Sequence, residues 1–171
     1  MMRFMRCSML AKRVTLPESG PEQTGGASVH HRALESLYRS APINHAFPSE
    51  LEIVEDGFAR IRFEVGTEHF HAAGALHGTA YFKMLDDAAF YAVNSLVTDR
   101  FVLTTAFNLL FTKPIKAGLV IAEGRWISGR KRVFVGDARL IDQYGDEAAR
   151  GTGTFMRSQI SLSSLTGYAR A

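Results

Sequence analysis

The sequence predicts an α+β fold in which a curved antiparallel sheet of about six strands wraps around one long central helix. Residues 77–95 contain no proline and are rich in Ala, Met, Leu, Phe and Tyr, as expected of a buried helix about 28 Å long. Two runs before this segment and four runs after it are typical of β-strands. A single apolar helix with this many strands indicates a sheet that curves around the helix.

The other elements follow from residue spacing and from the residues that end each run. Apolar residues at helical spacing predict a first helix over residues 28–39, and Pro42 ends it. Alternation with a period of two predicts strands at residues 51–54 and 59–65, joined by a glycine-containing turn. Four later strands are expected at residues 101–111, 119–127, 132–141 and 147–156. Their connections look short, which predicts an antiparallel meander.

The composition of the 171 residues is that of a soluble globular protein, with 46% hydrophobic and 22% charged residues. The 12 Phe, 5 Tyr and 1 Trp exclude disorder throughout the chain. No run approaches the ~20 apolar residues that a membrane span requires, so no membrane partner is expected. The single cysteine, Cys7, excludes an intrachain disulfide and favours a reducing, cytoplasmic setting.

Length and composition predict one domain, residues 29–171, preceded by an irregular N-terminal tail, residues 1–28. The tail is rich in Pro, Gly and polar residues and carries +2 of the net charge of +3. A targeting peptide is the alternative for residues 1–14, which are basic but lack the apolar run of a signal peptide. The rest of the chain is nearly neutral, which argues against a nucleic-acid partner.

The start of the long helix carries residues that suggest chemistry. Gly74 and Gly78 flank the helix N-terminus, where backbone N–H groups lack partners and an oxyanion can bind. Asp86 is a carboxylate in a mostly apolar helix, which is rare unless the group is paired or functional. The eight residues from Gly78 to Asp86 span about 12 Å, beyond the reach of an aspartate. If the two act together, Asp86 comes from a second protomer, which predicts a homodimer or a dimer of dimers with sites at the subunit interface.

The segments GALHGTAYFKMLDDAAFYAVNS and TTAFNLLFTKP resemble the hot-dog-fold acyl-CoA thioesterases, in the branch around the bacterial phenylacetate-degradation thioesterase. That family has a G-x-x-H-G-G motif, and an aspartate follows eight residues after the first glycine of the pair. The matching positions are Gly74, His77, Gly78, Asp86, Asn108 and Pro114. The resemblance covers about residues 30 to 158. It implies a hot-dog fold and hydrolysis of acyl-CoA to a free acid and CoA.

The resemblance also implies a role for individual residues. The Gly78 N–H would polarise the thioester carbonyl, and Asp86 of a partner protomer would act as a general base on water or as a nucleophile. Thr104 would help to place that water or carboxylate. His71 stands where the family has Asn or Gln near the thioester. Thr79 replaces the second glycine of the motif, which leaves less room beside the acyl group.

Several of the candidate site residues also have a structural alternative. Arg130 and Arg132 lie in a basic turn that could hold the phosphates of CoA, although charged hairpin tips are common. His77 could contact the substrate or cap the helix. Thr104 could also be an ordinary strand threonine.

Other interpretations of the same residues remain open. A hydratase or dehydratase of acyl thioesters would pair His71 with Asp86, and a non-catalytic acyl-CoA-binding module would use neither chemically. Asp86 could instead face solvent or pair with Lys83, and Asp87 would point about 100° away from it. No HExxH motif or cysteine cluster is present, so neither a metal nor a cofactor is expected.

Overall fold

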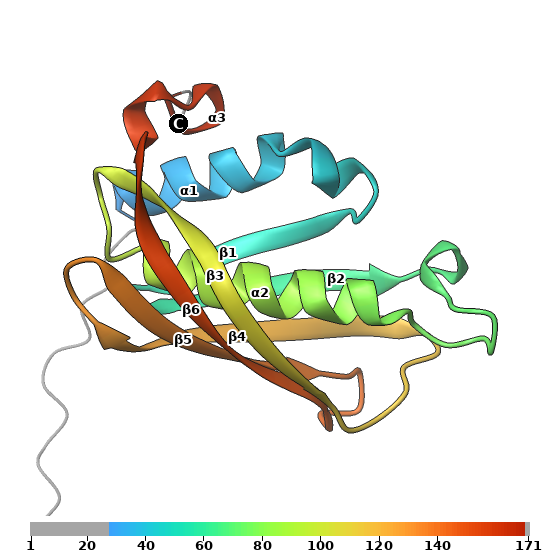
Figure 1. The fold of residues 1–171 in the computed structure, drawn as a ribbon. Coiled ribbons are helices and arrows are strands. Elements are labelled where there is room, and N and C mark those ends of the chain that lie inside the picture. The colour runs from blue at the N-terminus through green and yellow to red at the C-terminus, as the bar shows by residue number, and fades with distance from the viewer. Residues whose placement is uncertain (1–27, 170–171) are drawn as a thin grey trace, which may run out of the picture.

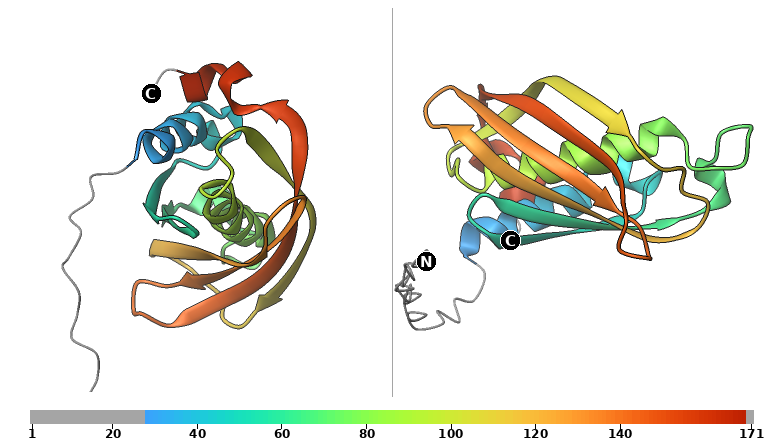
Figure 2. Two further views of the ribbon diagram at one scale, coloured as in Figure 1. Left: turned by 90° about the vertical axis from the view of Figure 1, so that its left-hand side faces the viewer. Right: turned by 90° about the horizontal axis from the view of Figure 1, so that it is seen from below.

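The computed structural model describes residues 28–169, which form a six-stranded antiparallel sheet around a central helix (Figure 1). The strands are β1 (Ser49–Glu55), β2 (Phe58–Val65), β3 (Arg100–Phe111), β4 (Gly118–Gly129), β5 (Val133–Ile141) and β6 (Glu147–Ser161). The helices are α1 (Val29–Ser40), α2 (Gly78–Asn94) and α3 (Thr166–Ala169), with short 3-10 turns η1 (Pro42–His45), η2 (Thr67–His69) and η3 (Leu162–Ser164). Viewed along α2, the sheet curves around this helix and α1 lies over the open side (Figure 2).

The predicted helices and strands are confirmed, but the expected meander is wrong for the first of the four later strands. The sheet order is β1-β2-β4-β5-β6-β3, so β3 pairs with β6 and not with β4. Residues 112–117, which follow β3, do not turn back as a hairpin because they are anchored beside α2. The Ile115 carbonyl accepts from the Leu76 N–H at 2.8 Å, and the Tyr81 hydroxyl donates to the Lys113 carbonyl at 3.0 Å. As a result, β3 forms a free edge of the sheet.

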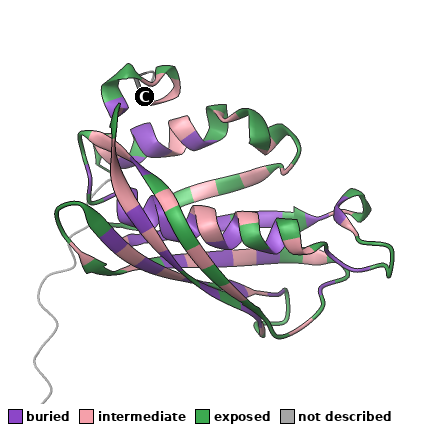
Figure 3. Cartoon of the chain, in the orientation of Figure 1, coloured by how far each residue is buried: buried purple, intermediate pink, exposed green. Residues whose placement is uncertain are grey.

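The core lies between α2 and the concave face of the sheet (Figure 3). Ala88 and Ala89 of α2 are fully buried. A Cβ atom on Gly124 of β4 would lie 2.1 Å from the backbone of Ala88, so only glycine lets the helix approach the sheet this closely. The apolar helix that the sequence predicts is therefore enclosed.

Helix α1 is fixed at its first turn and again near its end. The Ser28 side chain caps the helix by accepting from the His31 N–H at 3.1 Å. The His31 ring in turn bonds the Asp56 carboxylate at 2.7 Å. Further along α1, the Tyr38 ring packs edge-on against Tyr91 of α2, with 5.3 Å between ring centroids. Helix α1 thus contributes side chains to the surroundings of α2.

Within residues 28–169, no helix is long and apolar enough to cross a membrane. The predicted tail lies outside the described residues apart from Ser28, as does Cys7. The domain boundary at residue 29 stays a prediction, and α1 begins at Val29.

Candidate active site

The N-terminus of α2 presents a free backbone donor. Gly78 is the first residue of the helix, and His77 is its N-cap with an extended backbone. The His77 Nδ1 accepts from the Thr79 N–H at 3.1 Å, which confirms the capping interpretation of this histidine. No hydrogen bond from the Gly78 N–H is found within residues 28–169. This donor is therefore free to bind an oxyanion.

A short hairpin before α2 places His71 beside Gly78. Phe70 and Leu76 form a β-bridge, and the Gly74 N–H closes the turn by donating to the His71 carbonyl at 2.9 Å. Gly74 has φ of +76°, which favours glycine at this position. His71 and Gly78 then share a cavity of about 450 Å³. Its lining residues are His71, Leu76, Gly78, Tyr81, Phe111, Thr112, Lys113 and Pro114.

Asp86 lies in a second cavity, of about 260 Å³, where it contacts Thr104. The Thr104 hydroxyl donates to Asp86 Oδ1 at 3.0 Å and lies 3.3 Å from Oδ2. Burial raises the pKa of Asp86 to about 6, although the bond from Thr104 opposes the rise. An aspartate with a pKa near neutrality is suited to take a proton from water. The cavity is lined by Tyr38, Ala41, Ile43, Asn44, Asp86, Asp87, Phe90, Tyr91, Phe101, Leu103 and Thr104.

The two neighbouring aspartates have different partners. Lys83 forms an ion pair with Asp87, four residues on, and not with Asp86. The alternative in which Asp86 pairs with Lys83 is therefore wrong, because Asp86 turns toward Thr104 on β3. The two carboxylates diverge as expected, yet both line the same cavity.

Gly78 and Asp86 do not meet within one protomer. They line separate cavities that have no residue in common. His71 lies in the Gly78 cavity, so it does not pair with Asp86 inside one chain either. The structure thus brings Asp86 together with Thr104, and Gly78 together with His71.

Arg130 and Arg132 are exposed at the tip between β4 and β5. This tip lies at the end of the molecule where α2 ends, opposite Gly78 (Figure 1). The Trp126 indole closes the turn by donating to the Gly129 carbonyl at 3.1 Å. Neither arginine lines the cavity of Gly78 or that of Asp86. The two arginines can contact a molecule bound in either cavity only if that cavity belongs to another protomer.

Aromatic residues around Asp86 were missed by sequence reasoning. Phe90 and Tyr91 lie four residues after Asp86 and Asp87, so helical spacing could have placed them on the same face. Tyr38 comes from α1, and no local pattern links it to α2. These rings give the Asp86 cavity an apolar wall, which is the environment that raises a carboxylate pKa.

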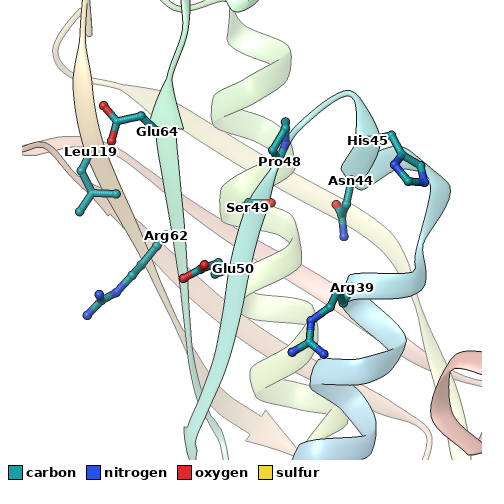
Figure 4. A pocket seen from close by; sticks show the side chains of 9 residues that line it. All are labelled: Arg39, Asn44, His45, Pro48, Ser49, Glu50, Arg62, Glu64 and Leu119. Atoms are coloured by element: carbon teal, nitrogen blue, oxygen red, sulfur yellow. The ribbon is translucent and has the colours of Figure 1, made fainter. Parts of the chain in front are cut away.

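A third cavity, of about 540 Å³, lies between the end of α1 and strands β1 and β2 (Figure 4). Its lining mixes Arg39 and Arg62 with Glu50 and Glu64, and it contains neither Gly78 nor a residue bonded to Asp86. Residues 28–169 contain no group of three or more His, Cys, Asp or Glu side chains that could hold a metal ion.

The amino-acid sequence matches one protein-family model and is similar to the sequences of two relatives. Residues 73–149 match the model of the thioesterase superfamily. A protein of Saccharolobus solfataricus named "Putative esterase" is 32% identical over 123 residues, which cover 72% of this chain and 82% of that protein. A protein of Sulfurisphaera tokodaii with the same name is 29% identical over 105 residues, covering 61% of this chain and 78% of that protein.

Solved structures resemble the fold. The Escherichia coli PaaI protein, from the phenylacetic acid degradation operon, gives a TM-score of 0.70 at 22% identity, covering 78% of this chain and 99% of PaaI. A thioesterase of Haemophilus influenzae gives a TM-score of 0.68 at 16% identity, covering 77% of this chain and 91% of that one. These likenesses confirm the predicted hot-dog fold. The family match and the 32% identity to the Saccharolobus solfataricus protein establish that the chain belongs to the thioesterase superfamily, which supports hydrolysis of a thioester.

Proposed function

We propose that the protein hydrolyses acyl-CoA thioesters at sites that are each assembled from two protomers. The observation that carries this proposal is the division of the chemistry between two cavities. One protomer supplies the free Gly78 N–H, and the other supplies Asp86 with Thr104. About 12 Å of helix separates the two halves within one chain, so one chain alone cannot join them. In a dimer whose two α2 helices run antiparallel, Gly78 of one protomer would lie beside Asp86 of the other.

In the proposed reaction the Gly78 N–H binds the thioester carbonyl oxygen, where negative charge develops. Asp86 either takes the proton from an attacking water or attacks the carbonyl carbon itself. The C–S bond then breaks and CoA leaves as its thiolate. If Asp86 acts as a base, the attacking water gives the free acid in this step. If Asp86 acts as a nucleophile, water next hydrolyses the acyl–Asp86 anhydride, which releases the acid and restores the carboxylate. Thr104 holds the carboxylate in place, while His71, His77 and Thr79 lie near the acyl-thioester linkage at the other half-site. Residues 29–171 form the catalytic domain, and the single cysteine favours a cytoplasmic setting.

The free edge at β3 supports an assembly of two or four protomers. Leu110 and Phe111 on this strand are 61% and 57% exposed, and Leu103 on the same strand and Phe82 of α2 are also exposed. Long apolar edge strands that stay uncovered are aggregation-prone. We expect light scattering to report a homodimer or a dimer of dimers. A fully active monomer would contradict the two-protomer site.

The arginines at the β4–β5 tip are proposed to bind the phosphates of CoA. Changing Arg130 and Arg132 to Ala is expected to raise KM for acyl-CoA several-fold, because two cations that face the anionic phosphates are lost. Added salt should have the same effect on the unchanged protein. An acyl thioester that lacks the nucleotide serves as the control, and its KM should change little. Equal losses on both substrates would assign the arginines a structural role.

Release of free thiol from a panel of acyl-CoA substrates tests the proposal directly. Hydrolysis of at least one member, lost on substitution of Asp86, supports it. Hydration of an enoyl-CoA without thiol release would instead favour the hydratase alternative. Binding of acyl-CoA without any turnover would favour a non-catalytic binding module.

A further inference from the structure

The cavity around Asp86 holds a second carboxylate that the proposed reaction does not use. Asp87 follows Asp86 directly and lines the same cavity. Thr104 bonds Asp86, whereas Lys83 pairs with Asp87. Among the described residues, no other charged side chain lines this cavity. Its charge is therefore determined by these two aspartates and one lysine.

The ion pair between Lys83 and Asp87 is largely enclosed. The Lys83 side chain is 10% exposed and the Asp87 side chain 24%. The Lys83 ammonium also lies 5.1 Å from the centroid of the Tyr38 ring, which stabilises the cation in this position. Burial raises the pKa of Asp87 and the ammonium of Lys83 opposes the rise, so the pair favours the ionised form of Asp87. Without Asp87, Lys83 would be an uncompensated cation beside Asp86, because enclosed charges are weakly screened.

The remaining titratable groups around the cavity are neutral. Tyr38 faces it from α1 and Tyr91 from α2. Burial raises the pKa of both phenols above its usual value, so neither carries charge near neutral pH. From β3, the neutral hydroxyl of Thr104 contacts Asp86.

We infer that Lys83 is a positioning residue for the hydrolysis, an inference that rests on the proposed function. By neutralising Asp87 it leaves Asp86 as the one uncompensated carboxylate of the cavity, and it thereby sets the lowest pH at which Asp86 is ionised. The carboxylate of Asp87 raises the pKa of Asp86 and the ammonium of Lys83 lowers it, so the intact pair acts as a nearly neutral unit.

A double-mutant cycle read out by pH tests this inference. The acid limb of kcat/KM is measured for the wild type, Lys83→Met, Asp87→Asn and the double variant. Lys83→Met should move the limb up by about one pH unit, because the cation that favours ionisation of Asp86 is lost. Asp87→Asn should move it down by a similar amount, and the double variant should return it close to the wild-type position. A purely structural role would lower kcat/KM at every pH without moving the limb.

Two further measurements keep the test decisive. If Lys83→Met does not fold, Asp87→Asn and the double variant still carry the comparison. Titration of the Asp86 carboxyl carbon by NMR should show the same opposite shifts without any turnover, so it separates this inference from the proposed function. The exposed Lys116, which lines neither cavity, provides the control, and Lys116→Met should leave the limb in place. If Asp87→Asn has the same acid limb and the same Asp86 titration as the wild type, the inference is overturned.

Discussion

Asp86→Asn is expected to lower kcat for acyl-CoA hydrolysis at least a hundredfold while KM changes little. The amide is nearly isosteric and can still accept the bond from Thr104, so the cavity keeps its shape. It can neither take a proton nor attack the carbonyl, and a general base is typically worth about 10² to 10⁴-fold. Steady-state kinetics with the best substrate of the acyl-CoA panel measures the loss. A variant that retains most of its kcat would remove Asp86 from the mechanism.

The same substitution should stabilise the protein at high pH, which distinguishes a catalytic loss from misfolding. Burial raises the pKa of Asp86 in the folded state to about 6, so its ionised form costs stability above that pH. Asparagine avoids this cost, which is at most about 3 kcal/mol. Thermal unfolding should therefore show a higher Tm for Asp86→Asn at pH 8, and the gain should disappear toward pH 4. Asp137→Asn, on β5 and outside the cavities described above, should change neither kcat nor this pH dependence.

Local patterns predicted the elements of the fold but not all of their pairing. The helix α2 could be predicted because its apolar residues surround it on nearly every side, and a sheet must then curve to cover it. The pairing of β3 with β6 could not, because it depends on where residues 112–117 are anchored. That anchor is Tyr81 of α2, whose hydroxyl donates to the Lys113 carbonyl and accepts from the Ile115 N–H. Contacts between segments so far apart leave no periodic signal in either of them.

For the candidate site, the sequence predicts the spacing of residues along the helix, but it does not predict the contacts between different elements. The glycines near position 78 and the carboxylate of Asp86 stand out because polar and glycine residues are exceptional in an apolar helix. The choice of Asp87 as the partner of Lys83 required the structure, since spacings of three and four both place a lysine beside an aspartate. The Tyr38 ring reaches the cavity only because α1 folds back over α2.

Gly78→Pro is expected to lower kcat at least a hundredfold relative to Gly78→Ala. Proline removes the N–H that is proposed to bind the carbonyl oxygen, and loss of one such donor costs about 10² to 10³ in kcat. It should not disturb the helix, because proline is favoured at the first helical position and the extended backbone of His77 suits a residue before proline. Alanine keeps the N–H and adds the same Cβ atom, 3.3 Å from Phe111 Cζ, so it controls for the change in shape.

Mixing the two inactive variants, Asp86→Asn and Gly78→Pro, is expected to restore hydrolysis. In a heterodimer one site receives both defects, whereas the other combines an intact Gly78 with an intact Asp86. Random exchange of subunits makes about half of the dimers mixed, so the mixture should reach about a quarter of the wild-type rate. The variants are denatured together, refolded and assayed for thiol release, and each variant refolded alone provides the background. A mixture no more active than that background would mean that Gly78 and Asp86 of one protomer act in the same site. The separation of about 12 Å along the helix argues against that arrangement.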